Sequence, residues 1–284
     1  MASTGTLLRV EIVKLLRRPM TWILALIYAA ILGMLYLTYI VLLASGDIEG
    51  MNKQDLKDLI YLPDGLAFGV SLATSVGTMV LIILAAGSFG SEFNWGTIRT
   101  MLLMRADRTR LFIAKFSVVL ALGLLTIVVG TAGSVAGAVI AGMAGGGGPA
   151  TSEWLTSAFV QDALLYALRA WVSLAIWALI AASVAILTHS LGVSIGITLA
   201  AYLIGDILTS LLAAAGRAGE YASRLFPNTG INALLALNSS DAPTYVTTDY
   251  LWIAANLLIY TTLFAALALT RFRTMNIMAA TSAG

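Results

Sequence analysis

Few side chains in this sequence could take part in chemistry, and their types exclude most catalytic sites. The 284 residues include no cysteine and a single histidine, His189. A disulfide framework, a thiolate zinc site and a cysteine nucleophile are therefore excluded, and a metal-catalysed reaction is not expected. No Gly-x-x-x-x-Gly-Lys-Ser/Thr loop for nucleotide phosphates occurs in the chain. We predict no catalytic residue, no metal ligand and no cofactor bound by this chain, which is then no enzyme by itself.

Two ionisable side chains lie within long apolar stretches. Asp206 is the one acid well inside such a stretch, and Arg169 enters another at a similar depth. A charge in lipid is costly and by default indicates function. We expect an Asp206–Arg169 pair or a shared wet cavity, although the same pair could have only a structural role.

Composition places most of the chain in a membrane. The sequence is 60% hydrophobic and only 11% charged, with a mean hydropathy of +0.93, whereas soluble domains carry about 25% charged residues. A membrane span needs about 20 mostly apolar residues. Six stretches qualify: 20–44, 65–90, 111–142, 163–187, 191–215 and 250–270. The predicted fold is all-α, a polytopic membrane protein with one transmembrane domain over residues 1–284.

The placement of charge predicts the orientation of these spans. Most of the 16 Lys and Arg residues fall in the N-terminal segment, the loop after the second span and the C-terminal tail. Basic loops stay on the cytoplasmic side, so both termini are expected in the cytoplasm. The net charge of +2 is too small to suggest nucleic-acid binding. Among the opposite connections, residues 216–249 contain an apolar stretch, 225–237, that could enter the membrane.

The N-terminal segment 5–18 has helical periodicity. Leu8, Ile12 and Leu15 fall on one face, and charged side chains fall on the other. The charged residues that we assign to this helix are Glu11, Lys14, Arg17 and Arg18. Pro19 then ends it. We predict an interfacial helix on the inner leaflet with its cations near anionic lipid headgroups, the alternative being a basic flank that only sets topology.

The segment 90–115 mixes large apolar side chains with several cations. A helix over about 91–104 would place Trp95, Ile98 and Leu102 on one stripe. Aromatic and arginine side chains tend to dominate the energetics of interfaces. The pattern therefore favours a docking surface, and the alternative is a membrane-hugging loop with the usual positive charge.

The order of residues in this segment resembles the corresponding loop of type-2 ATP-binding-cassette permeases, a mostly bacterial exporter family. The matching residues are Glu92, Gly96, Thr97, Ile98, Leu102, Leu103, Arg108, Leu111 and Lys115. The opening Glu11-x-x-Lys14…Arg17-Arg18-Pro19 is similar to that family's opening as well. Arg105 departs from the pattern, because many members have proline there. With the six spans, the resemblance covers nearly the whole chain.

The resemblance implies a permease subunit of an ABC exporter that works by alternating access. A coupling helix, Glu92–Met104, would dock on a separate ATPase subunit that binds ATP and magnesium. The docking residues would be Glu92, Phe93, Trp95, Gly96, Thr97, Ile98, Arg99, Leu102 and Arg108. A second permease chain, identical or different, would complete a dimer in the bacterial cell membrane, with the substrate crossing between the two chains. Segment 5–18 would be the family's connecting helix, and 216–249 would hold short re-entrant helices.

Two other classes of protein remain open. A secondary transporter or channel usually shows inverted repeats, broken helices or several polar groups at the midplane, and Asp206 alone is thin support for that. A scaffold that does not transport would share the docking loop without needing a pathway. The spans offer no ordered set of charges, which favours a lipophilic or peptide-like cargo.

Smaller features carry further expectations. Gly133-x-x-x-Gly137 and Gly192-x-x-x-Gly196 predict close helix contacts. His189, in the short connection between the fourth and fifth spans, either senses pH or simply faces water.

Overall fold

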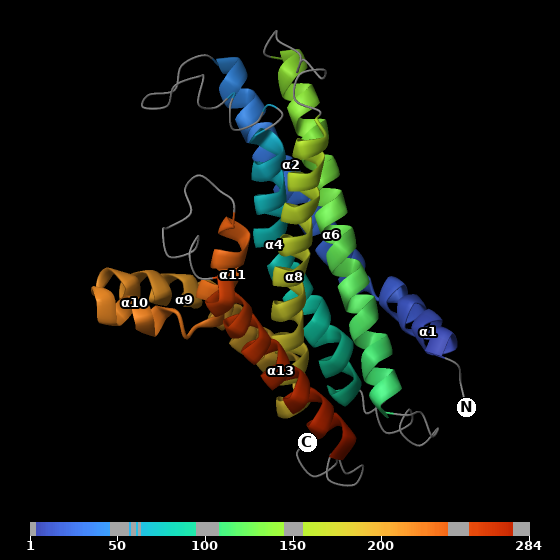
Figure 1. The fold of residues 1–284 in the computed structure, drawn as a ribbon. Helices are drawn as coiled ribbons and strands as arrows, with labels where there is room; N and C mark the ends of the chain where they lie inside the picture. The colour runs from blue at the N-terminus through green and yellow to red at the C-terminus, as the bar shows by residue number, and fades with distance from the viewer. Residues whose placement is uncertain are drawn as a thin grey trace. The chain divides into compact units, whose positions relative to one another are not determined.

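The computed structural model describes residues 4–45, 57, 61, 64–94, 108–144, 156–237 and 250–274, and in these residues every regular element is a helix. In chain order the helices are α1 (Thr4–Arg17), α2 (Pro19–Ser45), α4 (Asp64–Asn94), α6 (Arg108–Ala144), α8 (Ser157–Thr188), α9 (Leu191–Ala214), α10 (Arg217–Ser223), α11 (Pro227–Ala236) and α13 (Tyr250–Thr274) (Figure 1).

Six of these helices are long and apolar enough to cross a membrane, which confirms the predicted all-α polytopic fold. The spans are Pro19–Leu43, Gly65–Phe93, Arg108–Met143, Phe159–Thr188, Leu191–Ala214 and Tyr250–Thr274. Each coincides with one of the predicted stretches. The third has 36 residues, well beyond the roughly 20 that a bilayer requires.

Local sequence explains where several helices begin. Pro19 and Pro227 each stand at the first position of a helix, where proline loses no intrahelical hydrogen bond. Ser190 caps α9, because its side chain accepts a hydrogen bond from the Val193 backbone N–H at 3.4 Å. Between α8 and α9, His189 has a φ of +53°, and this left-handed residue allows the short connection between two long helices.

The chain contains two compact units. The terminal unit comprises Met1–Arg18, Leu81–Ala121 and Ala175–Gly284, and the central unit comprises Pro19–Val80 and Leu122–Leu174. Helices α4, α6 and α8 each contribute one part to each unit.

In the central unit, α2, α4 and α6 pack through small residues and hydroxyl groups. The Tyr28 hydroxyl donates to the Thr126 carbonyl at 2.9 Å, and Ser134 donates to the Gly65 carbonyl at 2.6 Å. A Cβ on Gly137 would lie 2.5 Å from the Tyr36 ring. Of the first predicted glycine pair, Gly137 therefore makes a close helix contact, whereas Gly133 has nothing within 4 Å in the part of the chain described.

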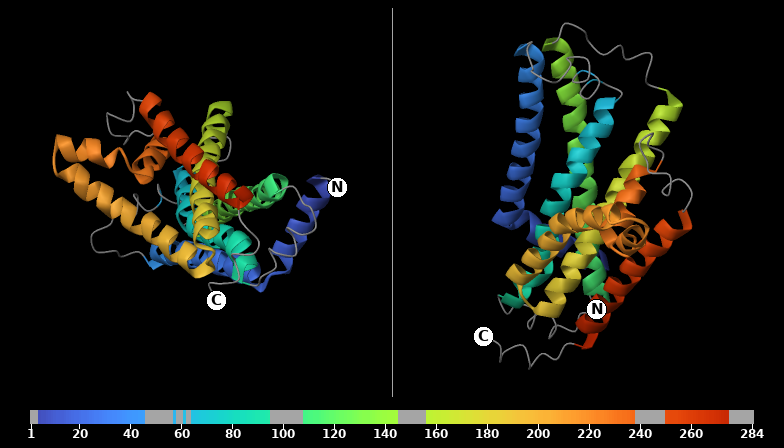
Figure 2. Two further views of the ribbon diagram at one scale, coloured as in Figure 1. Left: turned by 90° about the horizontal axis from the view of Figure 1, so that it is seen from below. Right: turned by 90° about the vertical axis from the view of Figure 1, so that its left-hand side faces the viewer.

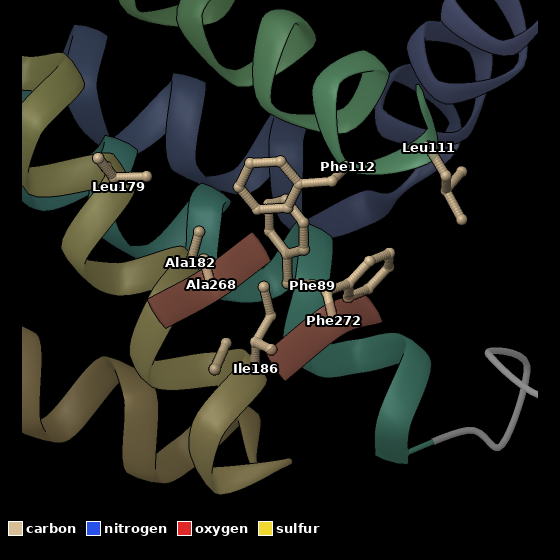
Figure 3. Packing of buried hydrophobic residues seen from close by; sticks show 9 residues of the cluster. Phe89, Leu111, Phe112, Leu179, Ala182, Ile186, Ala268 and Phe272 are labelled. Carbon is tan, nitrogen blue, oxygen red and sulfur yellow. The ribbon is translucent and has the colours of Figure 1, made fainter. Parts of the chain in front are cut away.

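In the terminal unit, an apolar core joins four helices. Its side chains come from α4, α6, α8 and α13 and are labelled in Figure 3: Phe89, Leu111, Phe112, Leu179, Ala182, Ile186, Ala268 and Phe272. The Phe112 ring lies 5.4 Å from that of Phe89 and 6.2 Å from that of Phe272, measured between centroids. The α4 and α6 ends that flank residues 95–107 are thus held against α8 and α13.

Helices α9, α10, α11 and α13 form the other part of the terminal unit. The chain turns back after α9, so that α10 lies against it (Figures 1 and 2). A Cβ on Gly205 of α9 would lie 2.4 Å from Asn228 Oδ1 on α11, and one on Gly230 would lie 2.2 Å from Asn256 Oδ1 on α13. These glycines bring α11 close to its neighbours, whereas Gly192 and Gly196 of the second predicted pair have nothing within 4 Å among the described residues.

Candidate functional site

The charged face of α1 points into the protein, which corrects the predicted orientation of this helix. Glu11 is only 3% exposed, whereas Ile12 of the predicted apolar face is 44% exposed, although Leu15 of that face is also buried. Lys14 is partly buried, and Arg18 Nη1, just after the helix, donates to the Gly87 carbonyl at 2.9 Å. The polar side chains turn inward because the ends of α4 and α6 offer them charged and carbonyl partners. Arg17 remains exposed.

Four side chains from three helices form what we call the charge cluster: Glu11 and Lys14 of α1, Glu92 of α4 and Lys115 of α6. Lys115 Nζ lies 2.8 Å from Glu11 Oε2 and 2.5 Å from Glu92 Oε1. Lys14 Nζ lies 3.1 Å from Glu11 Oε1 and 3.4 Å from Glu92 Oε1. Two lysines and two glutamates balance in charge.

Burial makes the charge cluster energetically demanding. The side chains of Lys115 and Glu92 are 1% and 2% exposed. Charges taken out of water are tolerated only with close partners and further hydrogen bonds, and Lys115 also donates to the Ser88 carbonyl at 3.4 Å. Removing one member of such a group typically costs about 3–5 kcal/mol, because the others stay buried without compensation.

The lysines keep Glu11 in its charged form. Burial alone raises the pKa of Glu11, but the charges and hydrogen bonds of Lys115 and Lys14 outweigh burial, so the pKa lies below that of an ordinary glutamate. Glu11 therefore does not resemble a proton-transfer residue, which needs a pKa close to the working pH.

The charge cluster and the apolar core flank the same segment of chain. Glu92 lies near the end of α4 at Asn94, and Lys115 lies two turns into α6, which begins at Arg108. The segment between the two helices, 95–107, is the one in which the sequence predicts a docking surface. Its two ends are thus joined to each other and to α1 by buried ion pairs.

The predicted docking residues fall into two groups. Trp95, Gly96, Thr97, Ile98, Arg99 and Leu102 lie outside the described residues. Glu92, expected on the docking surface, is instead buried in the charge cluster, because its carboxylate is the counter-ion of Lys115. Phe93 packs edge-on against the His189 ring, 4.8 Å between centroids.

Arg108 connects the start of α6 to the end of α13. Its Nη1 donates to the Arg273 carbonyl at 2.6 Å, and Arg273 Nε donates to Thr109 Oγ1 at 2.8 Å. Arg108 therefore contributes to the same packing of helix ends, in addition to any docking role that the resemblance implies.

His189, whose ring contacts Phe93 near the end of α4, is half-buried. Burial and the positive charge of Arg271 both lower the pKa of His189. Its Nε2 is buried with no hydrogen-bond partner among the described residues. The expectation that this side chain simply faces water is therefore wrong.

The intramembrane charges have separate surroundings. Asp206 of α9 accepts hydrogen bonds at Oδ1 from the side-chain amides of Asn228 at 3.0 Å and Asn232 at 2.9 Å, both on α11. Arg169 belongs to the central unit and Asp206 to the terminal unit, so their pairing stays a prediction. Sequence reasoning did not identify the two asparagines, although their spacing of four puts them on one face of a helix.

The described residues contain no group of three or more His, Cys, Asp or Glu side chains that could hold a metal ion. The site instead connects helices α1, α4 and α6 through ion pairs. Three helices meet at a balanced set of charges, and two of them flank the segment 95–107, which contains Trp95, Arg99 and Arg105.

Comparison with known proteins identifies the family of this chain. A family profile described as "ABC-2 family transporter protein" matches residues 7–205, which include α1, the charge cluster and most of the spans. The chain is also 33% identical over 69 residues to the uncharacterized protein YhcI of Bacillus subtilis (strain 168). That match covers 24% of this chain and 20% of the relative. Because the profile matches well over half of the sequence, this multi-pass membrane protein belongs to the ABC-2 transporter family.

Proposed function

We propose that the chain is the permease subunit of an ATP-driven exporter in a bacterial cell membrane, with both termini in the cytoplasm. A separate ATPase subunit, which binds ATP and magnesium, would dock on residues 93–104. A second permease chain, identical or different, would complete the working unit. Membership of the family and the distribution of basic residues support this assignment.

The observation that carries the proposal is the charge cluster. A force applied to segment 95–107 would reach α4 through Glu92 and α6 through Lys115, and the ion pairs would move both helix ends together with α1. Buried charges have no water to replace a lost partner, so the three helices resist separation. This is what a motor docked on a loop needs if its movement is to tilt spans rather than deform the loop.

In this proposal, closure of the ATPase around ATP would switch the spans between inward-open and outward-open arrangements. The described charge cluster would hold constant geometry while the spans move. Alternating access of this kind needs two states of the whole span bundle and one rigid connection to the motor. The permease chain itself would perform no phosphate chemistry, since the sequence has no phosphate-binding loop.

Co-purification tests the proposal first. The tagged chain is expressed in its native host, and the proteins bound to it are isolated in mild detergent. We expect the ATPase to co-purify with the wild type and to be lost on Trp95→Ala or Arg99→Ala. If no ATPase accompanies the wild-type chain, the proposal is contradicted and a scaffold or secondary transporter is favoured.

Coupling is tested on the same complex. Glu92→Gln removes one charge of the charge cluster without changing its shape. We expect the ATPase to stay bound while the nucleotide-dependent change in protease sensitivity of the spans drops at least tenfold in rate. The control is Glu220→Gln, which removes the acid of an ion pair with Arg224 on α10 at 2.9 Å. Equal coupling in both variants would argue against transmission through the cluster.

A further inference from the structure

The Asp206 carboxylate stands exposed on a membrane-spanning helix. It lies within the span Leu191–Ala214, roughly 12 Å along the helix from its Ala214 end at about 1.5 Å per residue. An ionised carboxylate facing hydrocarbon is strongly unfavourable, and such residues line cavities or pair with other groups. The exposed side of α9 at this depth therefore meets water, a ligand or another polar surface.

Two amides hold one oxygen of this carboxylate. Asn228 Nδ2 and Asn232 Nδ2 both donate to Oδ1, at 3.0 Å and 2.9 Å. Oδ2 accepts no hydrogen bond within the described part of the terminal unit. One face of the acid is thus fixed by the protein, and the other is open to a donor.

The amides are themselves held in place. Asn228 packs directly on Gly205, and its Nδ2 also donates to the Tyr202 carbonyl at 3.2 Å. Both asparagines lie on α11, whose first residue is Pro227, so the N-terminal part of this helix holds both amide donors beside the acid. The site is therefore preorganised around an anion with one free oxygen.

A ligand that completes this site must bring positive charge and an N–H donor. An ammonium group supplies both, whereas a neutral hydroxyl would leave the carboxylate charge uncompensated. One turn earlier on the same face of α9, Leu203 is 50% exposed and offers apolar contact beside the acid. An amine with an alkyl chain matches both features.

We propose that Asp206, Asn228 and Asn232 form a binding site for the ammonium group of an amphipathic amine. If the proposed transport function holds, this site recognises the head group of the cargo. Asp206 pairs with the ammonium through Oδ2, and the asparagines keep the carboxylate oriented toward it.

Direct binding tests the site. The permease chain alone is placed in phosphatidylcholine nanodiscs, and binding of radiolabelled n-octylamine is measured at neutral pH against empty nanodiscs, with n-octanol as the neutral competitor. We expect saturable binding that n-octanol does not displace. Asp206→Asn keeps an oxygen to accept both amide hydrogen bonds but removes the charge, and it should weaken binding at least tenfold. The control, Asp162→Asn, removes an exposed acid on α8 and should change affinity less than twofold.

A second measurement uses the wild-type chain, so it does not depend on the folding of a variant. Dicyclohexylcarbodiimide reacts with the protonated form of carboxyl groups in apolar surroundings, so labelling is carried out at mildly acidic pH, where a fraction of the carboxyl groups is protonated, and the modified residue is identified by mass spectrometry. We expect modification at Asp206, blocked by octylammonium and not by octanol. Unchanged affinity in Asp206→Asn, lack of protection, or displacement by equal concentrations of sodium or potassium would each overturn the proposal. No ATPase is present, so failure here is separate from failure of ATPase docking.

Discussion

At the scale of single residues, the charge cluster depends on matching four charges, three of which are out of reach of water. Lys115 is the most buried of them and contacts both glutamates, while Lys14 is 29% exposed and contacts the same two acids at longer distances. The two lysines therefore differ in importance although they have the same partners. Solvent screens the charge of Lys14, whereas no water can take the place of Lys115 beside the two carboxylates.

Lys115→Met tests this difference. It leaves two buried carboxylates facing one partly exposed lysine, so we expect a loss of about 3–5 kcal/mol in the free energy of unfolding. Lys14→Met should cost on the order of 1 kcal/mol, because exposed pairs contribute little. Thermal unfolding of the two variants in the same detergent gives the comparison. Equal losses would mean that Lys115 is not the central counter-ion.

His189 provides a pH-dependent test at the same scale. Its pKa in the folded chain lies below that in the unfolded chain, so acidification protonates the unfolded chain first. The stability that it contributes is full above the unfolded pKa of about 6.5 and is lost as the pH falls toward the folded pKa. His189→Asn, which suits the positive φ, should lose less stability between pH 7.5 and pH 5.5 than the wild type. A parallel loss in both proteins would show that His189 is not the source of this pH dependence.

At the scale of elements, the positions of the glycine residues determine which helices pack closely. Gly205 of α9 and Gly230 of α11 face asparagine side chains on neighbouring helices, while Gly196 of α9 faces open space among the described residues. The spacing of glycines in the sequence suggested Gly192 and Gly196 instead. A small-x-x-x-small pattern marks a face that permits close packing, but the partner that uses this face comes from a distant part of the chain.

Gly205→Ala and Gly196→Ala form a matched pair on one helix. A Cβ at Gly205 would lie 2.4 Å from Asn228 Oδ1, so the Asn228 side chain or α11 as a whole must shift, at a cost of about 1–3 kcal/mol. At Gly196 the same change meets no atom within 4 Å in the described chain and should stabilise the helix by up to about 1 kcal/mol. Cysteine pairs joining α9 and α11 can follow the shift directly, because the chain has no native cysteine. Equal effects of the two changes would show that α11 does not pack on Gly205.

At the scale of the whole molecule, the spans differ strongly in how far the chain itself covers them. The most apolar window of the α8 span is 72% buried, whereas those of α9 and α13 are each 17% buried. Helix α8 is therefore an internal element, and α9 and α13 present most of their surface outward. The low burial of α9 and α13 supports the proposal that lipid and a second permease chain cover the exposed faces of these helices.

The parts that sequence could predict are those set by local composition. The six spans follow from runs of about 20 apolar residues, and helix starts follow from Pro19, Ser190 and Pro227. Which face of α1 points inward could not be predicted from the local sequence, because Lys115, the ion-pair partner of Glu11, lies 104 residues away. Apolar periodicity also misleads in a membrane, where the exposed side of a helix is the apolar one.

Docking of the ATPase on residues 93–104, beside the charge cluster, is tested by photo-crosslinking. The photoreactive residue p-benzoylphenylalanine replaces Trp95, Arg99 or, as a control, Ala214 in the complex. We expect crosslinks to the ATPase from positions 95 and 99 and none from position 214. Crosslinks from Ala214 with none from Trp95 and Arg99 would contradict both the docking segment and the orientation of the spans.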